Sequence, residues 1–278
     1  MSPFDAVSHA YTTVATGGFS PHDLSIGYFN SPLIEAIAIV FMLAGGINFA
    51  IHFVVWRRLS PMPYMSDPEV RAYGLIFILA SLFIAASLYW TQVYNGVESI
   101  RHASFQVASI LTSTGFGTAT FAEWPLHIPL ILVMLSFTGG CAGSTAGGIK
   151  VLRILLLAKL GLRQLFQLAH PRAISVIKLG ARPVTEDVLF SVWGFYVLYI
   201  VTSLLLTVAM MAAGLDLESA LGAVVATINL LGPGLGDVAA NFTNVSDTVK
   251  WLGIFGMLVG RLEVFTLLIL FLPAYWRQ

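Results

Sequence analysis

Apolar residues along the chain form runs of two lengths. Four runs have the roughly 20 residues that a helix needs to cross a bilayer: residues 32–56, 70–90, 185–213 and 249–272. Three others are about a dozen residues long, a length typical of re-entrant or interfacial segments: residues 3–15, 101–113 and 217–230. The pattern predicts an all-α integral membrane protein in which spanning helices alternate with re-entrant ones.

A further apolar run, residues 125–160, is longer than one span and is interrupted at 138–148. With this run included, a short helix, a glycine-containing strip and a spanning helix follow one another at 3–56, 101–160 and 217–272. A leading span precedes the second and third of these units but not the first. We therefore expect pseudo-fourfold repeats of span, re-entrant pore helix, filter strip and span, with about five transmembrane helices and three pore helices.

Composition supports a membrane location. Hydrophobic residues make up 57% of the chain and charged residues 10%, well below the roughly 25% charge of soluble domains. The formal net charge is zero, which argues against a nucleic-acid partner. The single cysteine, Cys141, excludes a disulfide framework, and residues 1–23 lack the regions of a cleavable signal.

Charge predicts the orientation. Seven basic residues and no acid lie between positions 150 and 182: Lys150, Arg153, Lys159, Arg163, Arg172, Lys178 and Arg182. The 57–71 loop adds Arg57, Arg58 and Arg71. By the positive-inside rule these inter-unit loops face the cytoplasm, and the strips, whose neighbouring loops are mainly acidic, face outward. The basic 150–182 loop also suits anionic lipid headgroups.

Three strips carry the candidate chemistry, and each follows a short helix: Ala15, Thr16 and Gly17; Ser113, Thr114, Gly115 and Phe116; Leu230, Leu231 and Gly232. Irregular backbone at membrane depth is tolerated where it lines a cavity, and carbonyl oxygens from several strips can replace the hydration shell of a cation. The negative C-terminal end of each short helix favours a cation as well. One strip alone is equally explained by an ordinary loop glycine, but the recurrence after three half-length helices favours an ion filter.

The interruption at 138–148 is rich in glycine and small hydroxylated residues, among them Gly139, Gly140, Gly143, Ser144, Thr145, Gly147 and Gly148. Each glycine costs a helix about 1 kcal/mol relative to alanine, so we expect a break here, below the second strip and in the conduction path. The alternative is a close helix–helix contact of small residues. A phosphate loop is excluded because Ile149 separates Gly148 from Lys150.

Arg261 lies near the middle of the predicted span 249–272. A central arginine costs about 2.5–3.5 kcal/mol, so it is expected to face protein or water and to have a partner. Glu263 points to another side of the helix, which leaves the oxygens of 138–148 as the expected partners and Arg261 as a latch on that segment. Snorkelling to the interface is the alternative, but it needs a nearby helix end.

The strips resemble those of a known transport family. Ser113-Thr114-Gly115-Phe116-Gly117 is similar to the Thr-Val-Gly-Tyr-Gly filter of potassium channels. Thr16-Gly17-Gly18-Phe19-Ser20 and Asn229-Leu230-Leu231-Gly232-Pro233-Gly234-Leu235-Gly236 resemble the second- and fourth-repeat filters of the membrane subunits of bacterial Trk-type potassium uptake systems, in the Trk/Ktr/HKT superfamily. The resemblance covers essentially the whole chain, which looks like the C-terminal part of such a subunit without its first repeat.

On this resemblance, residues 1–57 are a partial second pore repeat, 70–160 the third, 161–184 a cytoplasmic basic loop and 185–278 the fourth. It implies potassium uptake across the bacterial cytoplasmic (inner) membrane, with potassium as substrate and no bound cofactor. It also implies an intramembrane gating loop at 138–148, and Gly17, Gly115 and Gly232 fit its potassium-selective pattern. The implied partners are a second copy in a homodimer and a cytoplasmic, nucleotide-binding regulatory subunit of the TrkA type. Coupling by symport is not determined by the sequence.

Two other readings of the function fit parts of the pattern. A secondary cation transporter with broken helices also has glycine-rich unwound segments at mid-membrane, but its repeats are normally inverted, whereas these units share one orientation. In the second alternative the chain is a truncated fragment that conducts no ions, because three strips do not form a four-fold filter. An enzyme is not expected, since the spans contain no Ser/His/Asp set and the six histidines have no metal-ligand spacing.

Overall fold

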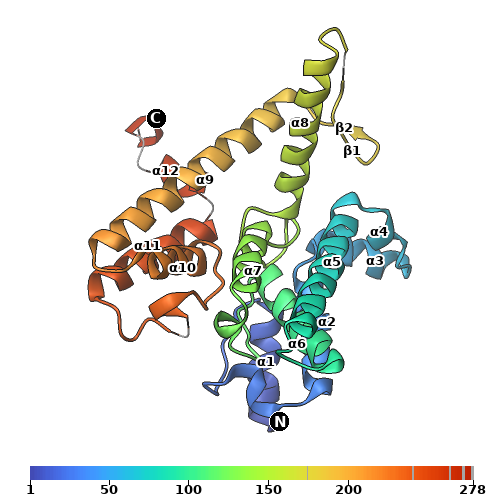
Figure 1. Ribbon diagram of the computed structural model, residues 1–278. Helices are drawn as coiled ribbons and strands as arrows, with labels where there is room; N and C mark the ends of the chain where they lie inside the picture. The colour runs from blue at the N-terminus through green and yellow to red at the C-terminus, as the bar shows by residue number, and fades with distance from the viewer. Residues whose placement is uncertain (174, 240, 263, 271–272, 277–278) are drawn as a thin grey trace.

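The computed structural model describes residues 1–278 except 174, 240, 263, 271–272 and 277–278 (Figure 1). The described residues are predominantly helical and include one short antiparallel hairpin, so the predicted all-α class is confirmed. The helices are α1 (Pro3–Val14), α2 (Pro32–Gly45), α3 (Phe49–Arg58), α4 (Met62–Ser66), α5 (Pro68–Trp90), α6 (Gly96–Leu111), α7 (His127–Thr138), α8 (Val151–Ala169), α9 (Glu186–Ala212), α10 (Leu217–Ile228), α11 (Asp247–Leu262) and α12 (Val264–Ile269). The strands are β1 (Lys178–Leu179) and β2 (Arg182–Pro183), and 3-10 turns lie at Ser25–Phe29, Phe121–Glu123, Gly236–Val238 and Pro273–Trp276.

Helices α1, α6 and α10 lie where the short apolar runs predict half-length helices. Each begins at a side-chain cap, which satisfies N–H groups of the first turn that have no helical partner: Ser2, Asn95 and Asp216. Because Asn95 supplies such a cap, α6 starts at Gly96, earlier than the predicted 101.

Helices α5 and α9 are long and apolar enough to cross a membrane, and the described residues contain a third such span only if α2 and α3 count as one. The predicted span over 32–56 is not one continuous helix, because α2 and α3 are bent by 100° at the residues between them. Asn48 accepts a hydrogen bond from Ala50 N at 2.8 Å and so starts a new helix. The Gly46 carbonyl accepts a bond from Cys141 N at 2.8 Å instead of continuing α2. The count of about five transmembrane helices stays a prediction.

The predicted break in the run 125–160 is confirmed, since α7 ends at Thr138 and α8 begins at Val151. The predicted loop at 161–184 is partly wrong, because α8 continues to Ala169. The one glycine within α8, Gly161, costs only about 1 kcal/mol, and the helix stops just before Pro171, whose missing N–H disfavours continuation. The predicted span 249–272 corresponds to α11 and α12; residue 263 between them lies outside the described residues.

Two half-length helices form the centres of two cores. Helix α6 packs against α2, α5 and α7, and α10 packs against α7, α9 and α11. In Figure 1 the two groups lie on either side of α7, and α8 extends upward from α7 to meet the start of α9. Helix α1 packs chiefly against α2 and leaves Phe4 and Tyr11 exposed. The three strips therefore extend from helix ends that the surrounding helices hold in place.

Candidate functional site

The three half-length helices end in the same way. The residue after the C-cap has a positive φ angle in each: Thr16 (48°), Ser113 (53°) and Leu230 (58°). The next N–H bonds back to the carbonyl five residues earlier, as in a Schellman motif: Gly17 to Thr12 at 2.7 Å, Thr114 to Ser109 at 2.8 Å, and Leu231 to Ala226 at 2.9 Å. Three sequences with little in common thus form one backbone structure.

This geometry changes the register of the first strip. A second positive φ falls two residues after the first, at Gly18 (66°), Gly115 (83°) and Gly232 (91°). The expected match of Gly17 with Gly115 is therefore off by one residue: Gly18 is the counterpart of Gly115, and Gly17 that of Thr114. The sequence Gly17-Gly18 offers both alignments, and the helix end decides between them.

Two hydroxyl groups that the sequence did not single out support the strips from behind. Thr12 Oγ1 donates to the Phe19 carbonyl at 2.9 Å, and Ser109 Oγ donates to the Phe116 carbonyl at 2.7 Å. Phe116 itself is buried, with its side chain in the core between α2 and α6. The third strip has Ala226 at the equivalent position and no hydroxyl. In both strips the hydroxyl belongs to a Ser or Thr seven residues before the phenylalanine of the strip, a spacing that is visible in the sequence.

The strips lie side by side in chain order. A methyl group added at Gly18 would lie 1.8 Å from the Thr114 carbonyl oxygen, and one at Gly115 would lie 2.2 Å from the Leu231 carbonyl oxygen. Only glycine allows backbones to approach this closely, so the first strip contacts the second and the second contacts the third. At Gly232 no described atom lies within 4 Å of the same position.

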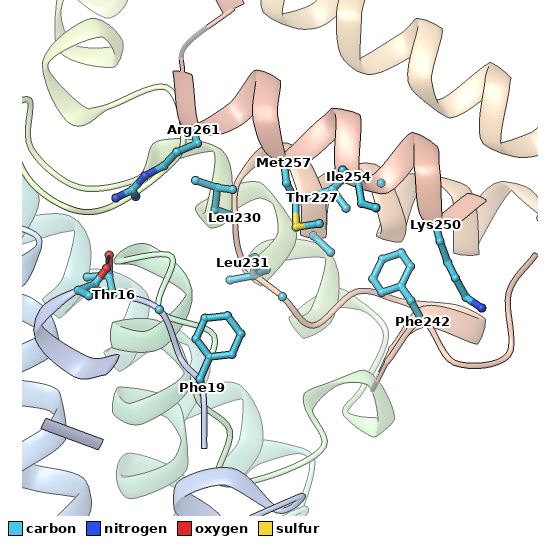
Figure 2. A pocket seen from close by; sticks show the side chains of 15 residues that line it. Thr16, Phe19, Thr227, Leu230, Leu231, Phe242, Lys250, Ile254, Met257 and Arg261 are labelled. Atoms are coloured by element: carbon cyan, nitrogen blue, oxygen red, sulfur yellow. Dashed lines mark hydrogen bonds between the residues drawn. The ribbon is translucent and has the colours of Figure 1, made fainter. Parts of the chain in front are cut away.

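A cavity of about 540 Å³ separates the third strip from the first. Figure 2 shows Thr16 and Phe19 on one side of it, Leu230 and Leu231 on the other, and α11 along its wall. Gly17 and Gly232 also line this cavity. The described strips thus form three sides of a ring that is open between Gly232 and Gly17.

Carboxylates lie at the N-terminal ends of two half-length helices, α1 and α10. A hydrogen bond from Ser2 lowers the pKa of Asp5, and one from Ser219 lowers the pKa of Asp216. Both groups therefore stay ionised at neutral pH. A second cavity of about 420 Å³ is lined by Asp23 together with Gly115 and Pro233 of the strips. The Asp23 carboxylate makes this cavity electrostatically favourable for cations.

The segment between α7 and α8, residues 139–150, passes beneath the strips, and we refer to it as the intramembrane loop. It contains seven of the eight residues predicted for gating, all except Arg261: Gly139, Gly140, Gly143, Ser144, Thr145, Gly147 and Gly148. Thr145 Oγ1 lies 3.3 Å from the Val14 carbonyl at the end of α1. A methyl group at Gly147 would lie 2.5 Å from the Asn229 carbonyl at the end of α10. The loop therefore bridges the ends of two half-length helices.

Arg261 contacts this loop, as the sequence predicts. Its Nη1 donates to the Thr145 carbonyl at 3.0 Å, and Figure 2 shows the side chain extending from α11. The other residue weighed as a partner, Glu263, lies outside the described residues. A role for Arg261 in gating stays a prediction.

Glu69 is a loop contact that the sequence did not suggest. One carboxylate oxygen, Oε1, accepts from Ala142 N at 2.7 Å and from Leu152 N at 3.0 Å. The residue is 7% exposed. Because Ala142 lies in the loop and Leu152 in the first turn of α8, a single buried acceptor holds the two ends of the loop together.

A buried network lies behind the third strip. The Tyr199 hydroxyl of α9 donates to Asn229 Oδ1, and Asn229 Nδ2 donates to Ser136 Oγ of α7 at 2.8 Å. Asn229 is the C-cap of α10, so the network joins the strip to the helix that leads into the intramembrane loop.

The chain is similar to known transport proteins over its whole length. The TrkH family, described as "Cation transport protein", matches residues 1–278. The Trk system potassium uptake protein TrkH of Escherichia coli (strain K12) is 48% identical over 100% of this chain and 58% of its own length. TrkG of the same organism is 38% identical over 100% of this chain and 57% of its own length.

One solved structure, the potassium transporter TrkH from Vibrio parahaemolyticus, superposes with a TM-score of 0.96 at 47% identity, covering 100% of this chain and 60% of that one. This chain therefore spans a little under two thirds of the length of the relatives it matches.

Proposed function

This chain belongs to the TrkH family of cation transport proteins, and from that premise we propose that it forms three of the four walls of a potassium-uptake pore. The observation that carries the proposal is the edge-to-edge contact of three strips with one backbone geometry, Gly18 against Thr114 and Gly115 against Leu231. Carbonyl oxygens held in this way suit a dehydrated cation. Potassium is then the substrate, and the chain is a transporter and not an enzyme.

The proposed ion-binding residues are those of the strips, with Gly18 added to the set predicted from the sequence: Ala15, Thr16, Gly17, Gly18, Ser113, Thr114, Gly115, Phe116, Leu230, Leu231 and Gly232. The fourth wall would occupy the cavity between Gly232 and Gly17. The greater length of the relatives supports this part of the proposal, because each has further chain beyond the region that this sequence matches.

The intramembrane loop is the proposed gate. Its support is its position at the ends of α1 and α10, where it contacts Val14 and Asn229, next to the first and third strips. Arg261 and Glu69 each bond to the loop, one through the Thr145 carbonyl and the other through Ala142 N. Ion passage then requires the loop to move.

We further propose a multi-pass location in the bacterial inner membrane, with the loops between units in the cytoplasm. The clusters of basic residues at 57–71 and 150–182 support this orientation. The same two regions are the proposed contact surface for a nucleotide-binding regulatory subunit of the TrkA type. A homodimer is proposed on the resemblance alone. The shared orientation of α1, α6 and α10 argues against the inverted repeats of a secondary transporter.

Potassium and rubidium uptake in cells that lack their own uptake systems tests the proposed function. Two forms are compared: the chain as given, and the chain extended by a segment that carries a fourth strip. We expect uptake by the extended form only. If both forms insert into the membrane and neither takes up either ion, the filter proposal fails. If the chain alone matches the extended form, the requirement for a fourth wall fails.

Replacing Arg261 with alanine is expected to raise rubidium flux through the complete pore. A hydrogen bond from a charged donor contributes about 1.5–3 kcal/mol, so its loss shifts the loop toward the open state by about ten- to a hundredfold. Flux is measured in vesicles at equal protein content. Arg261→Lys keeps a cationic donor, and we expect its flux to lie between those of the wild type and Arg261→Ala. Unchanged flux in Arg261→Ala would show that this bond does not restrain the loop.

A further inference from the structure

Helix α3 presents an aromatic face that the described residues leave uncovered. Phe49, Phe53 and Trp56 are spaced as i, i+4 and i+7 and so lie on one side of the helix. Phe53 is 65% exposed and Trp56 is 81% exposed. Two exposed arginines, Arg57 and Arg58, end the helix. Aromatic side chains on one face with arginines beside them are typical of helices that lie in a membrane interface.

The position of α3 relative to a spanning helix fits such a location. Ala142 N of the loop donates to the Glu69 carboxylate at the start of α5. The next loop residue, Gly143, accepts from Phe49 N at the start of α3. The two helices therefore start at one level. Because α5 is long enough to span, that level is an end of the span, near the bilayer interface. Figure 1 shows α3 and α4 beside this end of α5.

The bend directs α3 along the interface. Helix α2 has an exposed apolar stripe that includes Leu33, Ile37 and Phe41, as a lipid-facing helix does. The 100° angle between α2 and α3 then places α3 roughly parallel to the membrane plane. Its aromatic side chains are positioned to enter the acyl boundary, where tryptophan is enriched.

Charge identifies the lipid. Residues 49–66, which form α3 and α4, contain Arg57 and Arg58 and no acid. The next carboxylate, Asp67, accepts bonds from Glu69 N and Val70 N at the cap of α5. In the proposed orientation these arginines face the cytoplasmic leaflet, whose anionic headgroups attract basic residues close to the surface. An anionic phospholipid is therefore the best match to the patch.

The same helix is bonded to the intramembrane loop. Phe49 N of α3 donates to the Gly143 carbonyl at 3.1 Å, and at the adjoining end of α2 the Gly45 carbonyl accepts from Thr145 Oγ1 at 3.2 Å. His52 fixes the bend itself, through Nε2 to the Ala44 carbonyl at 2.9 Å and Nδ1 to the Tyr64 hydroxyl at 2.7 Å. A displacement of α3 from the interface would therefore displace its contacts with the loop.

We propose that α3 binds anionic phospholipid headgroups of the cytoplasmic leaflet and, through Phe49 and Gly143, holds the intramembrane loop in its closed position. The gating half of this inference rests on the proposed function, whereas lipid binding is independent of it. The complete protein is expected to conduct less in vesicles that contain phosphatidylglycerol than in vesicles of phosphatidylcholine alone.

The test compares the full-length protein with the variant Arg57→Gln/Arg58→Gln. Arg172→Gln/Arg182→Gln serves as the matched pair, since it removes the same charge from exposed positions of the 150–182 region and leaves α3 unchanged. Lipid binding is measured as the fraction of spin-labelled phosphatidylglycerol that the protein immobilises, relative to spin-labelled phosphatidylcholine. An arginine near an anionic surface strengthens binding about fivefold. We expect the first variant to lose most of the preference for phosphatidylglycerol and the matched pair to lose less, because Arg57 and Arg58 flank the exposed aromatic face of α3.

Rubidium flux in the same vesicles tests the coupling. The first variant is expected to conduct equally in both lipid mixtures, while the wild type and the matched pair conduct several-fold less with phosphatidylglycerol. An undiminished preference for phosphatidylglycerol in the first variant overturns the inference, and shows that another segment or a partner protein covers α3. A lost preference with unchanged flux overturns the link to the loop. If no form conducts, the proposed function fails, while the spin-label result still decides lipid binding.

Discussion

Gly18→Ala is expected to abolish selective potassium uptake in the complete pore, whereas Gly17→Ala is expected to leave most of it intact. Gly18 has φ of 66°, where a side chain costs roughly 1–2 kcal/mol, and its new methyl group would lie 1.8 Å from the Thr114 carbonyl oxygen. Neither backbone can yield without separating the first two strips. At Gly17 the nearest described atom is a ring carbon of Phe19 at 3.3 Å, and this exposed side chain can rotate away.

The measurement is rubidium uptake in the presence and absence of excess sodium, at matched amounts of membrane-inserted protein. Gly117→Ala is a second control, because no described atom lies within 4 Å of its methyl position. A loss in Gly17→Ala with normal uptake in Gly18→Ala would restore the register expected from the sequence and contradict the equivalence of Gly18 with Gly115.

Glu69→Ala is expected to raise rubidium leakage through the closed pore at least about tenfold above that of the wild type. Removal of the carboxylate leaves the N–H groups of Ala142 and Leu152 without their acceptor. An unsatisfied buried donor costs about 1–3 kcal/mol, and this cost falls on the closed arrangement of the loop. The open arrangement becomes relatively more populated as a result.

Glu69→Gln is the matched variant, because its amide oxygen can still accept both bonds, and we expect flux close to that of the wild type. Rubidium efflux from vesicles gives the leak, and the melting temperature of the purified protein separates a loosened loop from a disrupted fold. Equal flux from all three proteins, with similar melting temperatures, would show that Glu69 does not restrain the loop.

Sequence patterns predicted the elements of this fold better than their directions. The half-length helices and the break before α8 follow from the length of apolar runs and from clustered glycine, both of which are local properties. The bend between α2 and α3 does not, because hydropathy over 32–56 is continuous. Asn48 and Gly46 become decisive only once Cys141, far along the chain, takes the Gly46 carbonyl.

The candidate site divides in the same way. Arg261 was predictable because a charge in an apolar run is anomalous wherever it points. The role of Glu69 was not predictable, because an acid after Asp67-Pro68 is typical of an ordinary helix start. Its bonds to Ala142 and Leu152 depend on a loop that is distant in sequence. The prediction of the register of the first strip was wrong for a third reason. Two adjacent glycines fit the motif equally well, and only the hydrogen bond from Gly17 to Thr12 distinguishes them.

The contacts between strips are directional, with a glycine on one edge and a carbonyl oxygen on the other. Units joined by such heterologous, head-to-tail contacts either close into a ring or continue as an open array. An array of three leaves one edge of each kind, Gly232 and Gly17, on opposite sides of a single cavity. It therefore accepts one more unit of the same handedness and then has no free edge. Closure at four strips thus follows from the edges themselves, because a fifth strip would have no edge to join.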